Sequence, residues 1–243
     1  MNAERTDEWQ LEKDIRAAED WFQQETGLWM TYLNREDREN VQDSMGHNLL
    51  PSMISIFRLY GHSPEKTARM AGLMKMLRCS GNLQKLVQDG MTKEGINRQV
   101  QYRVLISDQM MARALALLAA EEDAGLLPYF ARLVIRVSEG MMLYLERNRT
   151  LNEEILFAMY APWYGAAFYS AAALAGKEEK ERKQAESVGI AFGMKLEAQR
   201  EGIVRTKYRE EVDWSLLPEG TEKLFLMEMA AEPVEKGAEE HDI

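Results

Sequence analysis

Apolar residues recur along the chain at the spacing of amphipathic helices. In the clearest stretch, Phe130 to Leu145, they occupy positions i, i+3, i+4, i+7, i+11, i+14 and i+15, which follow one face of a helix. Similar stretches cover Met70–Leu77, Val104–Leu118 and Phe157–Leu174. Further helices are expected at about residues 7–25, 36–60, 178–200 and 221–231. No segment shows the alternation that is typical of a half-buried strand.

Proline and glycine fall between these stretches and mark their ends. Ser63 and Pro64, for example, have the residue types of an N-cap and a first helical position. The pattern predicts an all-α protein, a bundle of long helices in one domain over residues 1–231. The acidic tail, residues 232–243, has few apolar residues and is expected to be disordered.

Charge and hydropathy narrow the functional classes. The 243 residues carry 30 Lys and Arg against 40 Asp and Glu, a formal net charge of −10. This balance argues against nonspecific nucleic-acid binding, which depends on cationic side chains that neutralise phosphates. No apolar run approaches the roughly 18 residues of a membrane-spanning helix, and the first residues, MNAERTDEWQ, lack the pattern of a signal peptide. We therefore expect a cytoplasmic protein without a transmembrane segment.

Few residues suggest chemistry by type alone. His62 lies in a predicted turn and His241 in the tail, and neither has neighbours that would complete a metal site. The one cysteine, Cys79, lies among apolar residues and is expected to be a buried, inert thiol. The 16 methionines suit a core, an apolar ligand cavity or an adaptable partner surface.

Five segments, in this order along the chain, resemble the trans-polyprenyl diphosphate synthases, which have the all-α class I isoprenoid synthase fold. The strongest is LISDQMMARA, residues 105–114, and the resemblance covers about residues 40–205. It implies an isoprenoid synthase-like helical domain. The matching segments are Gly46–Pro51, Leu105–Ala114, Phe130–Gly140, Pro162–Gly176 and Ser187–Phe192.

The resemblance also implies two Asp-rich motifs, on facing helices, that hold Mg²⁺ against a diphosphate leaving group. In this sequence both motifs are degenerate, with one acid left in each. Mg²⁺ needs several oxygen ligands, so these residues are not expected to assemble the metal site. The first motif falls on Lys85, Leu86 and Asp89, and the second on Leu196, Glu197 and Arg200.

The cationic residues that grip diphosphate in the family are also replaced. The expected Lys and Arg side chains of the first diphosphate segment, the Arg pair after the first motif and a Lys-Thr pair have no counterpart here. Loss of charge-assisted contacts to diphosphate would be costly at each position. The residues at these positions are His47, Asn48, Leu50, Lys93, Trp163 and Tyr164.

The matching segments, together with the lost charges, lead to a hypothesis. The chain is most similar to component I, the non-catalytic subunit, of bacterial heptaprenyl or hexaprenyl diphosphate synthases. The resemblance implies a catalytic partner that carries the Mg²⁺ and elongates the prenyl chain, with no cofactor in this chain. This chain would support the partner and help set product length. Candidates for contacts with a prenyl chain or with the interface are Met110, Met111, Met141, Met142 and Phe168, although core packing explains each of them as well.

Two alternatives stay open at this point. The chain could be a divergent isoprenoid synthase or prenyltransferase that is active on its own with a relocated acidic site. It could also be a homodimeric pseudoenzyme that binds an apolar ligand, such as a prenyl chain or prenyl diphosphate, in the old cavity.

Overall fold

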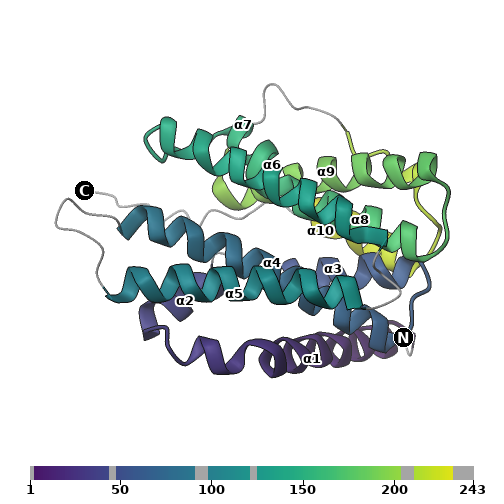
Figure 1. Cartoon of the computed structure of the whole chain (residues 1–243). Helices are drawn as coiled ribbons and strands as arrows, with labels where there is room; N and C mark the ends of the chain where they lie inside the picture. Colours follow the sequence, from purple (N-terminus) through teal and green to yellow (C-terminus); the bar gives the residue numbers. More distant parts are fainter. Residues whose placement is uncertain (1–2, 44–47, 91–97, 121–124, 204–210, 232–243) are drawn as a thin grey trace, which may run out of the picture.

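Helices make up the architecture of the described residues, and no strand occurs among them (Figure 1). The computed structural model describes residues 3–43, 48–90, 98–120, 125–203 and 211–231. The longer helices are α1 (Ala3–Met30), α2 (Arg35–Asp43), α3 (Leu49–Leu59), α4 (Pro64–Gly90), α5 (Arg98–Ala120), α6 (Leu127–Glu146), α8 (Ala161–Leu174), α9 (Glu179–Glu201) and α10 (Thr221–Ala231). Shorter elements are α7 (Glu153–Ile155), the π-helical turn η2 (Leu156–Tyr160) and the 3₁₀ turn η3 (Trp214–Leu216).

The helix signals in the sequence are confirmed at several ends. Pro64 begins α4, and the backbone N–H of Lys66 donates to Ser63 Oγ at 3.3 Å. Helix α9 begins with a capping box between Glu178 and Glu181. The one helix predicted over residues 36–60 is wrong, because this segment forms two helices, α2 and α3, on either side of residues 44–47. Those four residues and the tail at 232–243 lie outside the described residues.

Helix α4 lies at the centre of the bundle, which explains its unbroken run of buried residues from Met70 to Ser80. It packs against α1, α3 and α5, while α8 packs along α9 (Figure 1). Large buried side chains fill the core between these helices. They include Phe22, Phe57, Phe130, Phe168 and Phe192.

Glycines let α8 and α9 approach closely. A Cβ atom at Gly189 would lie 2.6 Å from the carbonyl oxygen of Tyr164, and one at Gly193 would lie 2.5 Å from Tyr164 Cδ2. Such distances leave no space for a side chain at either position. The Tyr164 ring of α8 therefore packs against Gly193, which lies one helical turn before Glu197 on α9.

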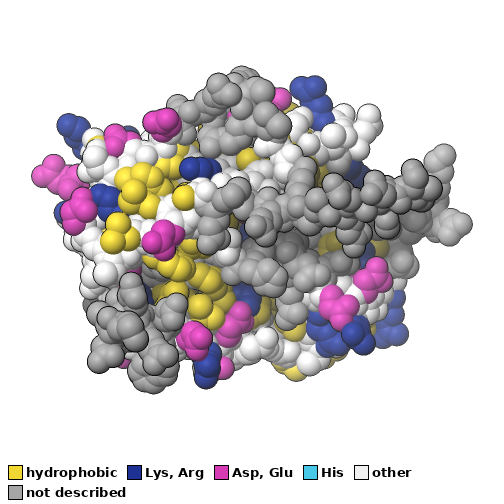
Figure 2. Space-filling model, turned by 180° about the vertical axis from the view of Figure 1, so that it is seen from behind, with side chains coloured by type: hydrophobic (Ala, Val, Ile, Leu, Met, Phe, Trp, Pro, Cys, Tyr) yellow, Lys and Arg dark blue, Asp and Glu magenta, His cyan; other side chains and the backbone are white. Residues whose placement is uncertain are grey.

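Two further surface features belong to the fold. Hydrophobic side chains gather in a patch on part of the rear face (Figure 2), and α10 exposes Leu224 and Met227. Among the described helices, none combines the length and apolar character that a membrane span requires.

Candidate functional site

A buried charged cluster joins α4 to α9, the helices that carry the two degenerate motifs. Its centre is the Glu197 carboxylate. Arg200 Nη2 lies 2.8 Å from Glu197 Oε2, and Arg78 Nη2 of α4 lies 3.6 Å from Glu197 Oε1. The Tyr164 hydroxyl donates to Glu197 Oε1 at 3.2 Å. The side chains of Arg78 and Glu197 are only 3% and 2% exposed. We call Arg78, Tyr160, Tyr164, Glu197 and Arg200 the α4–α9 cluster.

Tyr160 supplies the aromatic face of this cluster. The guanidinium carbons of Arg78 and Arg200 lie 4.3 Å and 5.6 Å from the centre of its ring, within the range of cation–π attraction. Tyr160 is the last residue of η2, where the Ala161 N–H donates to the Leu156 carbonyl. Pro162 follows directly, and because proline lacks an N–H and crowds the preceding turn, the wider turn accommodates it.

Burial sets the protonation of the two tyrosines. It raises the pKa of Tyr164, and the Glu197 carboxylate raises that pKa further. Burial also raises the pKa of Tyr160, although the positive charges of Arg78, Lys85 and Arg200 oppose the shift. Both hydroxyls are therefore protonated at neutral pH, so Tyr164 acts as a hydrogen-bond donor to Glu197.

The cluster does not fit a magnesium ion. Mg²⁺ prefers near-octahedral oxygen coordination with carboxylates and waters. Here both oxygens of Glu197 face cationic or donor groups, and two guanidiniums lie where a metal would add further positive charge. In the described part of the chain, no three His, Cys, Asp or Glu side chains gather in a way that could hold a metal ion.

The structure brings some predicted motif residues together. Lys85 of the first motif and Glu197 and Arg200 of the second all act electrostatically on Tyr160. The ammonium of Lys85 also lies 5.0 Å from the centre of the Tyr144 ring. The carbonyl of Leu86 accepts a hydrogen bond from Arg103 at 3.0 Å.

Other predicted residues have structural surroundings or cannot be placed. Leu50, Trp163 and Leu196 are buried in the apolar core, and Asn48 is an exposed residue that precedes α3. His47, Lys93 and the side chain of Asp89 lie outside the described residues.

His62 and Cys79, for which the sequence predicted no catalytic or metal-binding role, both pack against the rest of the chain. The His62 ring lies 2.8 Å from the carbonyl oxygen of Ala171 and contacts Phe57. Cys79 is fully buried, and burial raises the pKa of its thiol to about 12, which confirms the prediction of a buried, unreactive thiol.

An apolar groove between α4, α5 and α6 forms a second candidate region. Its volume is about 320 Å³, and we call it the α5–α6 groove. Met141 and Met142 line it together with Val87 and Val104. Met110 and Phe168 are instead buried in the core, and Met111 is half-buried.

Helices α5 and α6, which form two walls of the α5–α6 groove, expose large apolar side chains. Leu105 of α5 and Ile135 of α6 are each 59% exposed, and Met142 of α6 is 62% exposed. Exposed apolar groups that cluster at a groove are typical of binding surfaces rather than of free monomer surface.

Arg78 and Tyr160 were not among the residues that the sequence pointed to. Arg78 is a cation inside the apolar stretch that begins at Met70. A charged residue on the buried face of a core helix requires a partner, and this signal could have marked it. The role of Tyr160 depends on the π-helical turn, which the periodicity of the sequence does not reveal.

Comparisons with known proteins agree with this architecture. No model of a known protein family matches the sequence, and no curated protein matches it. Solved structures do match. A geranylgeranyl pyrophosphate synthetase from the archaeon Geoglobus acetivorans is 13% identical over 93% of this chain and 99% of that protein, with a TM-score of 0.66.

Two further structures show the same likeness. A polyprenyl synthase from Caulobacter crescentus CB15, complexed with calcium and isoprenyl diphosphate, is 19% identical over 78% of this chain and 62% of that one, with a TM-score of 0.61. A deletion mutant of the heterotetrameric geranyl pyrophosphate synthase of mint is 12% identical over 91% of this chain and 98% of that one, with a TM-score of 0.60. The chain therefore has the all-α isoprenoid synthase fold of the prenyl diphosphate synthases, the family that its sequence resembles.

Proposed function

We propose that this chain is a catalytically silent subunit of a heteromeric polyprenyl diphosphate synthase. In this assembly a partner with intact Asp-rich motifs holds Mg²⁺ and performs chain elongation. The chain described here packs against that partner and helps set product length. The fold, which resembles that of solved prenyl diphosphate synthases, supports this proposal.

The observation that carries the proposal is the use of Glu197. It is the only acid of the second degenerate motif, and Arg78, Arg200 and Tyr164 contact both of its oxygens. A carboxylate in such a site ties two helices together through ion pairs, and a hard cation at this carboxylate would lie beside two guanidiniums. On the facing helix, Asp89 is the only acid between Arg78 and Lys93.

The α5–α6 groove supports the second half of the proposal, a partner subunit. Met142 of its lining, and Leu105 and Ile135 on the same two helices, are exposed side chains that a packed helical surface would remove from water. Met141 and Met142 line the groove, and methionine adapts to irregular apolar surfaces. One structural neighbour, the mint enzyme, is heterotetrameric by its description.

An elongation assay tests this function. The purified chain, a candidate catalytic partner and their mixture are each incubated with labelled isopentenyl diphosphate, farnesyl diphosphate and Mg²⁺. We expect elongated product in the mixture, and far less or none with either protein alone. Turnover by this chain alone would contradict the proposal and favour a divergent enzyme. A chain that copurifies as a homodimer with an apolar ligand, and does not change the partner's products, would also contradict it.

A further inference from the structure

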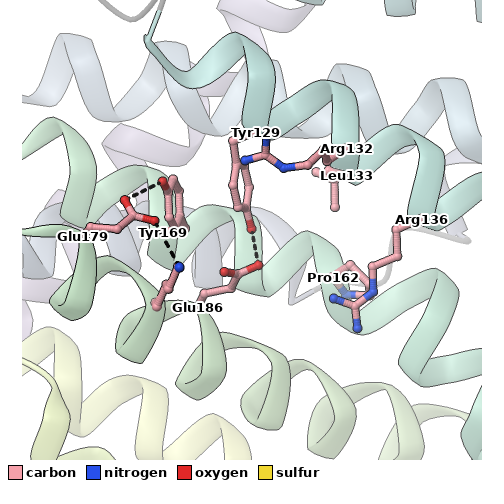
Figure 3. Close-up of a pocket in the computed structure, with 9 residues that line it drawn as sticks. Tyr129, Arg132, Leu133, Arg136, Pro162, Tyr169, Glu179 and Glu186 are labelled. Carbon is pink, nitrogen blue, oxygen red and sulfur yellow. Dashed lines mark hydrogen bonds and ion pairs between the residues drawn. The ribbon is translucent and has the colours of Figure 1, made fainter.

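A polar groove lies between α6, α8 and α9 (Figure 3), and none of its lining residues belongs to the α4–α9 cluster. Its volume is about 370 Å³, which is within the usual range for sites that bind small molecules. We call it the α6–α9 groove. Its lining includes Tyr129, Arg132 and Arg136 of α6, Tyr169 of α8, and Glu179, Lys183 and Glu186 of α9.

Two stacked tyrosines form one wall of the groove. The ring centres of Tyr129 and Tyr169 are 4.0 Å apart, and the ring planes differ by 5°. Each hydroxyl donates to an acid of α9, Tyr129 to Glu186 at 2.8 Å and Tyr169 to Glu179 at 3.2 Å (Figure 3). Burial and the adjacent Glu186 carboxylate raise the pKa of Tyr129, so this hydroxyl is a donor at neutral pH. The wall is therefore flat and well ordered.

The acids of the groove already have partners. Glu186 accepts the Tyr129 hydrogen bond. Glu179 accepts from Tyr169 and lies within ion-pair distance of Lys183, at 3.8 Å, and of Arg182, at 3.9 Å.

The acids of the groove have partners, but the two arginines of α6 do not form ion pairs with described residues. Arg132 and Arg136 are one helical turn apart, so they lie on the same side of the helix. Arg136 stacks on the Phe157 ring at 4.9 Å and has no acidic partner among the described residues. Within the described part of the chain, Arg132 makes no hydrogen bond or ion pair. A protein with a net charge of −10 therefore presents, at one groove, two guanidiniums that form no ion pair with any described residue.

We propose that the α6–α9 groove binds a small phosphate-bearing anion without a metal ion, through Arg132 and Arg136. A guanidinium presents parallel N–H donors that match the oxygens of a phosphate, and such charge-assisted pairs are strong. The two guanidiniums lie at different places along the groove, that of Arg132 near Tyr129 and that of Arg136 near Pro162 (Figure 3), so a ligand with two phosphoryl groups can engage both better than a ligand with one. This site is separate from the proposed subunit function and does not depend on it.

Isothermal titration calorimetry of the full chain with inorganic diphosphate, in the presence of EDTA, tests this site. We expect saturable binding to one site per chain, weakened by added salt. The R132Q/R136Q variant should lose affinity by at least about tenfold. The matched control is R16Q/R35Q, which removes two exposed arginines that already have carboxylate partners, and its affinity should be unchanged.

A second variant distinguishes binding from a structural effect. E186Q removes a negative charge from the groove while keeping a hydrogen-bond acceptor for Tyr129, so it should raise the affinity for diphosphate by a few fold. A purely structural role of the groove predicts no such gain. The proposal is overturned if diphosphate does not bind, if R132Q/R136Q binds as well as the wild type, or if citrate binds at this groove and diphosphate does not. The partner-dependent elongation assay is a separate readout, so failure here leaves the proposed function to be judged on its own.

Discussion

The α4–α9 cluster and the α5–α6 groove both include residues of α4, and they differ in whether their side chains meet partners within the chain or face water. In the cluster, buried charges compensate one another within the chain. In the groove, apolar side chains of α5 and α6 remain exposed to water. A buried site whose charges are compensated within the chain holds a fold together, whereas an exposed apolar surface gains free energy when a partner buries it. The proposed role of a silent subunit rests on this contrast.

Removal of Glu197 should have the largest effect. Glu197→Ala leaves the buried Arg78 without its counter-charge, and breaking a buried pair in this way costs about 3–5 kcal/mol. Urea denaturation should show this loss. The control Glu12→Gln, at an exposed ion pair, should change the free energy of unfolding by less than about 1 kcal/mol.

A double variant keeps this prediction testable if Glu197→Ala does not fold. Arg78→Met together with Glu197→Leu removes both buried charges, and such replacements are often close to neutral. The double variant should therefore be more stable than Glu197→Ala. If Glu197→Ala is as stable as the wild type, the cluster does not stabilise the crossing of α4 and α9.

The close packing behind the cluster predicts a smaller loss. In Gly193→Ala the new Cβ would lie 2.5 Å from Tyr164 Cδ2, so the ring that donates to Glu197 must move, at a cost of about 1–3 kcal/mol. Gly27→Ala is the matched control. Its Cβ would meet nothing closer than 3.6 Å, so it should stabilise α1 by about 0.5–1 kcal/mol. Thermal denaturation that ranks the two variants in the opposite order would contradict this packing.

Variants of the exposed apolar face at the α5–α6 groove test whether this face contacts the proposed partner subunit. Leu105→Glu together with Met142→Glu places charges on the exposed apolar face and should lower the activity of the mixture at least about tenfold, because burying an unpaired charge is unfavourable. The stability of the isolated chain should change little, since both side chains are exposed. Leu28→Glu, at another exposed leucine on α1, is the control. If the wild type, the double variant and the Leu28→Glu control give equal activity when mixed with the partner, then the partner does not use this face.

The smallest expected effect concerns pH and Cys79. Burial raises the pKa of this thiol from 9.0 to about 12. Above about pH 9 the unfolded thiol loses its proton while the native thiol keeps it, so the native state binds more protons and stability falls as pH rises toward 12. Cys79→Ala removes this contribution, so its free energy of unfolding should fall less steeply between pH 9 and 11. Urea denaturation at several pH values compares the two proteins, and parallel slopes would contradict the prediction.

The sequence predicted the helices well where periodicity and end signals agreed. Pro64 and the apolar face of Phe130 to Leu145 are local features, and α4 and α6 follow them. The segment at 36–60 was mispredicted as one helix. Its apolar spacing does not mark where α2 ends and α3 begins. The all-α fold itself agreed with the family resemblance.

The candidate site was only partly predictable. The sequence identified Glu197 and Arg200 as remnants of a motif, and both lie in the α4–α9 cluster. It did not identify Arg78, whose role depends on a contact between helices more than 100 residues apart, or Tyr160, whose position depends on a π-helical turn. Such long-range contacts and irregular turns leave no periodic signal in one sequence.

Metal binding by the purified chain tests the central claim most directly. Mn²⁺, a paramagnetic substitute for Mg²⁺, is titrated into the chain with farnesyl diphosphate, and free Mn²⁺ is measured by electron paramagnetic resonance. A titration of farnesyl diphosphate without protein is the reference. The account predicts that the chain binds no stoichiometric Mn²⁺ beyond this reference, because Glu197 is held by Arg78 and Arg200. Binding of one or more Mn²⁺ per chain, dependent on the diphosphate, would contradict it.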